Sequence, residues 1–346
     1  MLNNFFAKFS KDLGIDLGSS STLIISNDKG IVIDEPSVVA VNTRTDEILA
    51  VGVEAAKMSG KTPAHIMTIK PLSNGVISDF EVAEKMIKYF IDKVHAENFT
   101  LLPRPRIVIN IPSDITEVEK KAVEDVTKTA GAREILLVDN ALVAAVGARL
   151  PVLDATANMI IDIGGGKTEI AIVSLGGVVT WKNLRLSGIT LDQDIVQYAR
   201  DEFNMLIGER VAEDIKKRIG SASPLAEQVE MNMCGRDLVN GLPKEIVIND
   251  GQVREALSRS IFHIIESIKA TLEMTPPELV ADIYERGIIL TGGGALLRGL
   301  DKEIANATKI PVRIADDPLT CVVRGTGKIL EDLEIYKNIF LPSASN

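Results

Sequence analysis

Short apolar runs, separated by small and polar residues, dominate the first part of the chain. The segments GIDLG, STLIIS, GIVIDE and PSVVAV have the length and the β-branched content of strands, and Gly, Ser and Asn-Asp pairs separate them. Apolar residues at helical spacing follow over 80–96, and RIVINIP then reads as a buried strand. The capping-box spelling Thr116-x-x-Glu119 predicts a helix that ends at Gly131. This alternation predicts an α/β fold.

The same pattern begins again near the middle of the chain. The string NMIIDIGGGKTEIAIV echoes LGIDLGSSSTLIIS, and Asp16 and Asp162 occupy matching positions. Helices are expected over about 190–218 and 253–274, the strand GIIL runs into TGGGALLRGL, and a last helix is expected over 322–337. The repeat predicts two similar halves of about 150 residues each.

Composition narrows the class of protein. The chain has 346 residues, of which 46% are hydrophobic and 25% charged, which is ordinary for a globular protein with a large core. Acidic residues outnumber basic ones by 48 to 38, so we expect no nucleic-acid partner. Two cysteines without a CxxC motif exclude a disulfide framework and fit a cytoplasmic protein. Neither a membrane-spanning run nor a secretory signal is recognisable.

Three turns of small residues each follow an apolar strand. They are Ser19–Ser21, Gly164–Gly166 and Gly292–Gly294. Turns without bulky side chains let backbone N–H groups approach a phosphate closely, and a helical pattern after the third turn would add the positive end of a helix. One such turn is more often a plain hairpin. Three of them, two preceded by an Asp, indicate phosphate binding.

The two aspartates carry a sharper signal. A carboxylate at the end of an apolar strand is costly unless it meets a partner. If Asp16 and Asp162 faced each other across a cleft, they would hold a hydrated Mg²⁺, which takes few carboxylates and keeps waters and phosphates as ligands. The alternative is that each aspartate caps an Asx-type turn in its own hairpin.

Together these features resemble the actin and sugar-kinase nucleotide-binding superfamily. The strings GIVIDEPSVVAV, DIGGGKTEIAIVSLGGVV, GRDLVNGLPK, LTGGGALLRGLD and DPLTCVVRGTGK narrow the resemblance to the MreB family of bacterial actins, over essentially the whole chain. The resemblance implies an actin-like duplicated α/β fold, with two RNase H-like halves, four subdomains, and ATP with Mg²⁺ in a central nucleotide cleft. Domain I would cover 1–150 with 319–346 returning to it, and domain II would cover 151–318.

The resemblance also implies partners and a place in the cell. The chain would polymerise with itself into filaments, double and antiparallel, that lie on the inner face of the cell membrane as a peripheral cytoplasmic cytoskeleton. Paralogous bacterial actins are further candidate partners. The expected role is cell shape or motility.

The residues that the resemblance assigns to the nucleotide and its metal come from the three turns and one later helix. They are Asp16, Gly18, Ser19, Ser20, Ser21, Asp162, Gly164, Gly165, Gly166, Lys167, Glu213, Lys216, Gly292, Gly293, Gly294 and Ala295. The first two turns would bind phosphates, and the third would lie against the nucleoside. Glu213 and Lys216 would contact ribose and adenine, although without the resemblance they indicate only a solvated helix face.

The departures from the family pattern are informative. Where the family reads EEPMAAAIG, this chain has Asp139 and Asn140, so an uncharged amide replaces the glutamate that orients the attacking water. Lys167 replaces a threonine that helps to hold this water, and Ile189 removes a nearby carboxylate. Losing such acid–base assistance costs about 10²–10⁴-fold in rate. With Asp162 in the same catalytic set, Asn140 and Lys167 predict weak or lost hydrolysis.

Other interpretations stay open for these positions. The two replacements could be harmless drift in a working ATPase that orders water through other groups. Lys167 could pair with the γ-phosphate or project into solvent. A nucleotide-independent scaffold is a further alternative, disfavoured by the retained aspartates and turns.

Two apolar segments are candidates for membrane contact. Leu2, Phe5, Phe6 and Phe9 share one helical face. A second group precedes two arginines that suit an anionic surface, and its members are Phe99, Leu101 and Leu102. The alternatives are an N-terminal arm packed on its own domain or frayed, and a loop packed on the neighbouring helix.

Overall fold

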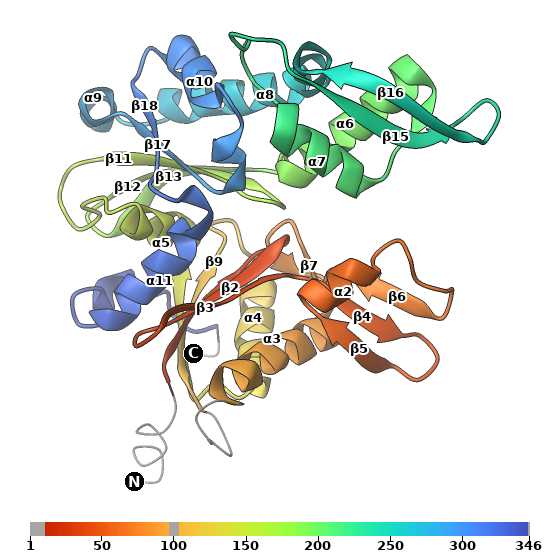
Figure 1. Ribbon diagram of the computed structural model, residues 1–346. Coiled ribbons are helices and arrows are strands. Elements are labelled where there is room, and N and C mark those ends of the chain that lie inside the picture. Colours follow the sequence, from red (N-terminus) through yellow and green to blue (C-terminus); the bar gives the residue numbers. More distant parts are fainter. Residues whose placement is uncertain (1–10, 97–103, 345–346) are drawn as a thin grey trace. The chain divides into compact units, whose positions relative to one another are not determined.

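The computed structural model describes residues 11–96 and 104–344, which form two compact units (Figure 1). One unit holds the described residues of Met1–Ala155, Val173–Val178 and Thr320–Asn346, and the other holds Thr156–Ile172 and Val179–Leu319. Within the described ranges, no helix has the length and apolar character needed to cross a membrane.

A mixed sheet with the order β10-β9-β1-β2-β3 forms the centre of the first unit. Its strands are β1 (Leu13–Leu17), β2 (Ser21–Ser26), β3 (Gly30–Pro36), β9 (Arg106–Ile111) and β10 (Glu134–Asp139). The early strands pair antiparallel, whereas β1, β9 and β10 run parallel to one another. The predicted strands in this region are therefore confirmed.

Helices cover both faces of this sheet. They are α3 (Phe80–His95), α4 (Glu117–Thr129), α5 (Asn140–Gly147) and α11 (Cys321–Glu331). Side chains of α3 and α4 share one buried apolar cluster with Ile15 and Ile107 of the sheet. On the other face α11 lies so close to β1 that a Cβ on Gly14 would be 2.4 Å from the hydroxyl oxygen of Thr326.

Smaller elements complete the first unit. They are β4 (Val39–Asn42), β5 (Glu47–Val51), α2 (Val53–Met58), β6 (Ile66–Ile69), β7 (Leu72–Ser73), β8 (Val76–Ile77) and the 3₁₀ helix η4 (Lys337–Ile339). A second sheet has the order β5-β4-β6. The predicted capping box of α4 is present, because the Thr116 hydroxyl accepts from the Glu119 N–H and the Glu119 side chain accepts from the Thr116 N–H.

The second unit is built on a sheet with the order β13-β12-β11-β17-β18. Its strands and helices are β11 (Asn158–Ile163), β12 (Thr168–Ser174), β13 (Gly177–Leu184), α6 (Gly188–Phe203), β14 (Met205–Leu206), α7 (Glu209–Ile219), β15 (Glu230–Asp237), β16 (Pro243–Asn249), α8 (Asp250–Glu273), α9 (Pro277–Arg286), β17 (Ile288–Thr291), α10 (Leu300–Thr308) and β18 (Val312–Ile314), with the 3₁₀ helices η2 (Gly293–Leu296) and η3 (Pro318–Thr320). The strands β14, β15 and β16 form a separate small sheet.

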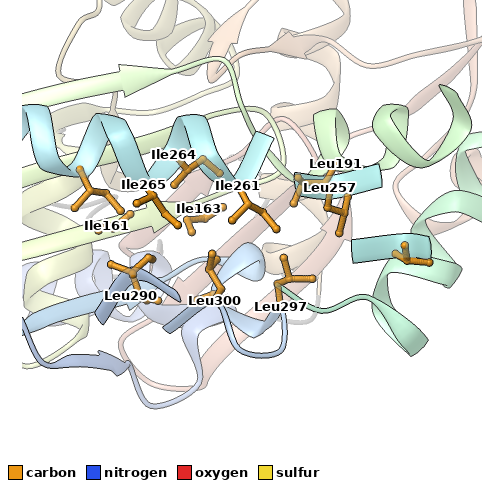
Figure 2. Packing of buried hydrophobic residues seen from close by; sticks show 14 of the residues in the cluster. Ile161, Ile163, Leu191, Leu257, Ile261, Ile264, Ile265, Leu290, Leu297 and Leu300 are labelled. Atoms are coloured by element: carbon orange, nitrogen blue, oxygen red, sulfur yellow. The ribbon is translucent and has the colours of Figure 1, made fainter. Parts of the chain in front are cut away.

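The apolar stripe predicted over 253–274 is the buried face of α8. Figure 2 shows Ile261, Ile264 and Ile265 of this helix above Ile161 and Ile163 of β11, within one buried cluster. Since side chains alternate along a strand, Asp162 points to the opposite face from its two isoleucine neighbours. Packing of the core thus aims this carboxylate away from the apolar cluster.

The two sheets confirm the duplication read from the sequence. The order β10-β9-β1-β2-β3 matches β18-β17-β11-β12-β13, so β1 corresponds to β11. In both sheets the strand that carries the aspartate runs parallel to its later neighbour, β9 or β17. The fold is a duplicated α/β fold of the expected kind.

Two predicted helices have other bounds in the structure, and the helix expected after the third turn is of another kind. The helix expected over 190–218 breaks at Asn204, which adopts a left-handed conformation (φ 48°), and α7 starts anew after Gly208. The last helix ends at Glu331 rather than 337, because the chain turns to pair Phe340 with the edge strand β10. The third turn leads into the single 3₁₀ turn η2, not into an α-helix.

Candidate functional site

The first small-residue turn is a braced hairpin between β1 and β2. The Ser37 hydroxyl donates to the Gly18 carbonyl (2.6 Å), and the Gly75 N–H donates to the Ser19 hydroxyl oxygen (2.9 Å). Ser19 is buried, whereas Ser20 at the tip is exposed. The turn is therefore held in one shape, and its tip stays accessible.

Asp16 belongs to a polar network at the carboxyl ends of β1 and β9. The Asn110 amide donates to the Asp16 carboxylate (3.1 Å) and to the Asn140 side-chain oxygen (2.7 Å). These bonds use both N–H groups of Asn110 and fix the orientation of Asn140, whose acceptor oxygen faces Asn110. Asn140 is 3% exposed. The other polar atom of this side chain is the nitrogen of its NH₂ group, which is a donor.

Asp139, the neighbour of Asn140, has a structural role. Its carboxylate accepts from the Ser113 hydroxyl (2.7 Å) and from the Ala141 N–H (3.1 Å), which makes it the N-cap of α5. This carboxylate is committed to starting the helix. It does not take the position of the glutamate that Asn140 replaces.

The second turn joins β11 to β12 and carries Lys167. The Gly164 N–H donates to the Lys167 carbonyl (2.9 Å), which closes the hairpin. The Lys167 ammonium lies 2.7 Å from a carboxylate oxygen of Glu169, and the two side chains are 15% and 1% exposed. Lys167 therefore does not project into solvent. Its charge is paired with the buried carboxylate of Glu169, which lies two residues further along the chain in β12.

The third turn packs directly on the end of β11. A Cβ on Gly292 would lie 2.5 Å from the Asp162 carboxylate, and a Cβ on Gly294 would lie 2.1 Å from the Ile163 side chain. Gly292 also has φ 77°, which disfavours other residues. Ala295 is fully buried in the core behind this turn. Glycine is therefore required for the close approach of the turn to Asp162.

Lys216 extends from α7 to the start of α6, which is bonded to the second turn. Its ammonium donates to the Gly188 carbonyl at the start of α6 (2.7 Å) and lies 2.7 Å from the Asp192 carboxylate. The Gly188 N–H in turn donates to the Gly164 carbonyl (2.9 Å). Glu213 is half-exposed and pairs with Lys217 (2.6 Å) on the outer face of the helix.

The structure gathers the predicted residues into two groups, one in each unit. Asp16 and the first turn form one group, and the second turn, the third turn and Lys216 form the other. Three further side chains were missed in the sequence: Asn110, Glu169 and Asp192. Glu169 was open to prediction, because residues two apart on a strand share a face. The other two meet their partners only through strand pairing or helix packing.

The polar atoms of these groups suit a magnesium nucleotide. The side-chain amide oxygen of Asn110 is buried and has no hydrogen-bond partner among residues 11–96 and 104–344, so it offers an acceptor beside Asp16. Waters of a hydrated Mg²⁺ are donors, and carboxylate and amide oxygens are the acceptors they meet in proteins. The third turn approaches Asp162 through glycines, so no side chains of these glycines cover the backbone there.

The residues named as membrane candidates lie outside the described ranges. They are Leu2, Phe5, Phe6, Phe9, Phe99, Leu101 and Leu102. The roots of both segments are described and lie side by side. The Lys11 N–H donates to His95 Nε2 (3.2 Å), and the Arg106 N–H donates to the Asp12 carboxylate (2.9 Å). Arg106 pairs with Glu134 (2.7 Å), which offsets part of its charge.

Comparisons with known proteins agree over nearly the whole chain. A family model described as MreB/Mbl protein matches residues 10–338. Cell shape-determining protein MreB of Escherichia coli K12 is 46% identical over 340 residues, which cover 97% of this chain and 98% of the relative. Cell shape-determining protein Mbl of Bacillus subtilis 168 is 45% identical over 326 residues, which cover 94% and 97%.

Solved structures agree as well. The crystal structure of Spiroplasma citri MreB5 bound to ADP has a TM-score of 0.90 at 37% identity, and the match covers 95% of this chain and 98% of that chain. The structure of the same protein bound to AMPPNP has a TM-score of 0.89 at 36% identity.

Proposed function

This chain belongs to the MreB/Mbl family of bacterial actin-like, cell shape-determining proteins, and we propose that it binds Mg-ATP and polymerises into filaments while hydrolysing ATP weakly or not at all. Nucleotide binding is supported by the retained turns and aspartates and by the nucleotides bound to Spiroplasma citri MreB5. Asp16 and Asp162 would hold Mg²⁺ through water, and the first two turns would bind phosphate oxygens. The bound nucleotide supplies the phosphate bond whose cleavage other actins use to loosen filaments.

The proposal of weak hydrolysis is supported mainly by the side chain of Asn140 and its hydrogen bond. A catalytic water needs an acceptor that orients it and takes its proton. The acceptor oxygen of Asn140 is bonded to Asn110 at 2.7 Å, and an amide cannot take a proton at neutral pH. The adjacent carboxylate of Asp139 caps α5 instead. The position that would activate water therefore lacks its base.

Lys167 adds to this effect. A lysine at this position contributes no hydroxyl, and its ammonium is held 2.7 Å from Glu169. An ammonium has donors only, so it cannot accept a proton from water. The two replacements together favour a chain that keeps ATP bound, and filaments whose lifetime is set by something other than hydrolysis.

Thermal unfolding with and without nucleotide tests the binding proposal. A ligand that binds only the folded state raises the unfolding temperature by mass action. We expect millimolar Mg-ATP, but not Mg²⁺ alone, to stabilise the chain, and samples spun after addition of Mg-ATP should contain sedimenting polymer. The variant Asp162→Asn should lose most of the stabilisation. No shift with millimolar Mg-ATP would contradict nucleotide binding and favour a scaffold.

We propose further that the chain lies on an anionic membrane surface through its two apolar segments. The roots of residues 1–10 and 97–103 lie side by side, joined by the contact between Lys11 and His95. Apolar segments that leave a protein at the same place can enter one lipid interface together. With a net charge of −10 on the whole chain, the attraction must come from apolar insertion and local arginines.

A further inference from the structure

The Lys216 ammonium joins two helices of the second unit, and one of them is bonded to the second small-residue turn. Lys216 of α7 lies 2.7 Å from the Asp192 carboxylate and donates to the Gly188 carbonyl at 2.7 Å. The start of α6 is also hydrogen-bonded to the loop Gly164–Gly166, because the Gly188 N–H donates to the Gly164 carbonyl at 2.9 Å. A Cβ on Gly188 would be 3.5 Å from the Lys216 nitrogen and 3.5 Å from the Gly164 oxygen. The ammonium is thus fixed beside this turn.

Asp192 is largely shielded from water. The residue is 7% exposed, and the Lys216 side chain is 15% exposed. Burial raises the pKa of Asp192 to about 6, while the Lys216 ammonium opposes that rise. The other charged groups that act on it are Glu213, which raises the pKa, and Lys217, which lowers it. The carboxylate is therefore ionised at pH 7.5 and becomes protonated as the pH falls through about 6.

We propose that Asp192 is a positioning residue for the nucleotide: it holds the Lys216 ammonium beside the second turn, where the amine meets the ligand. A lysine has a flexible four-carbon stem and three N–H donors. Asp192 and Gly188 restrain it and occupy two directions, so the third is set for the nucleotide. The inference rests on the proposed nucleotide binding. It adds Asp192, a residue that would act on the nucleotide only through Lys216.

Binding measurements at two pH values test this role. Affinities for ATP and ADP with Mg²⁺ are measured by calorimetry on the full chain at pH 7.5 and pH 5.5, with Asp192→Asn and the matched control Asp194→Asn. Asp194 is on the same helix, its carboxylate accepts from the Ser260 hydroxyl at 2.5 Å, and burial raises its pKa as well. The phosphates of the nucleotide titrate in every sample alike, so differences between proteins report the protein.

We expect Asp192→Asn to weaken binding roughly tenfold at pH 7.5, as for the loss of a charged, buried contact. Because Asp192, with a pKa of about 6, is only partly protonated at pH 5.5, the wild-type chain and Asp194→Asn should weaken about threefold more than Asp192→Asn when the pH falls from 7.5 to 5.5. Asp192→Asn should show only the pH dependence of the nucleotide. Equal affinities and equal pH profiles of the wild-type chain and Asp192→Asn would overturn the inference.

A double-mutant cycle separates positioning from damage to the fold. If Asp192 acts through the ammonium, Asp192→Asn should change affinity little in a Lys216→Met background. An equal loss in both backgrounds would mean that Asp192 supports the unit as a whole, and would overturn the inference. A wild-type chain that binds no Mg-ATP at pH 7.5 would overturn the proposed function first, and this inference with it.

Discussion

The ion pair between Lys167 and Glu169 makes a quantitative prediction about stability. The two charges are 2.7 Å apart, but Glu169 is 1% exposed and Lys167 is 15% exposed. Removing one partner of a buried pair leaves an uncompensated charge and costs about 3–5 kcal/mol. Lys167→Met should therefore destabilise the second unit by about 3 kcal/mol or more, because the buried Glu169 cannot reach water.

Removing the carboxylate instead of the ammonium should lower the free energy of unfolding by less. In Glu169→Gln the ammonium keeps a flexible stem at a partly exposed position and can turn toward water, so we expect about 1 kcal/mol. The double variant Lys167→Met/Glu169→Gln should be more stable than Lys167→Met alone, which gives a coupling energy of about 2 kcal/mol.

The single tryptophan supplies a local probe for this measurement. Trp181 is on β13, next to the strand β12, which carries Glu169 and directly follows Lys167. Its fluorescence during guanidinium unfolding reports on this sheet, which matters because chains of two units need not unfold in one step. Equal effects of the two single changes, or strict additivity in the double variant, would refute the pairing and the burial argument with it.

Two further predictions concern the third turn and the apolar N-terminal segment. Gly294→Ala puts a methyl group 2.1 Å from the Ile163 side chain, so it should displace the end of β11, cost about 1–3 kcal/mol and reduce stabilisation by Mg-ATP; Gly208→Ala, whose methyl meets nothing within 4 Å, is the control, and equal behaviour of the two variants would contradict the close packing. Deleting residues 1–10 should abolish co-sedimentation with anionic vesicles and leave stabilisation by Mg-ATP intact; unchanged vesicle binding would mean that this segment does not hold the chain on lipid.

Much of the fold followed from local patterns. The repeated strand–turn–strand strings predicted the duplication, and the spelling Thr116-x-x-Glu119 predicted a real capping box. The capping box is a local signal because it depends on residues within four positions of one another, and the repeat needs only a comparison of two short strings. The break at Asn204 was missed for the same reason: the pairing of β14 with β15, which is not local, draws the chain out of its helix there.

The site was less predictable than the fold. The sequence pointed to Asn140 as a lost base, but it could not show that Asn110, from another strand, would bind its acceptor oxygen. The salt bridge of Lys216 with Asp192 joins two helices whose packing no short pattern encodes. Residues on separate elements meet only through the register of strands and the packing of helices.

The proposal of an ATP-bound, hydrolysis-poor filament is tested most directly by phosphate release. The wild-type chain, the double variant Asn140→Glu/Lys167→Thr and Escherichia coli MreB would be assayed side by side with Mg-ATP, and the same samples would be spun for polymer. Trp181 fluorescence confirms that the variant is folded, since Lys167→Thr leaves Glu169 without its lysine.

We predict sedimenting wild-type polymer with almost no phosphate release, and a gain of about 10²-fold or more in the double variant. Release by the wild-type chain as fast as by its Escherichia coli relative, unchanged in the double variant, would contradict the account.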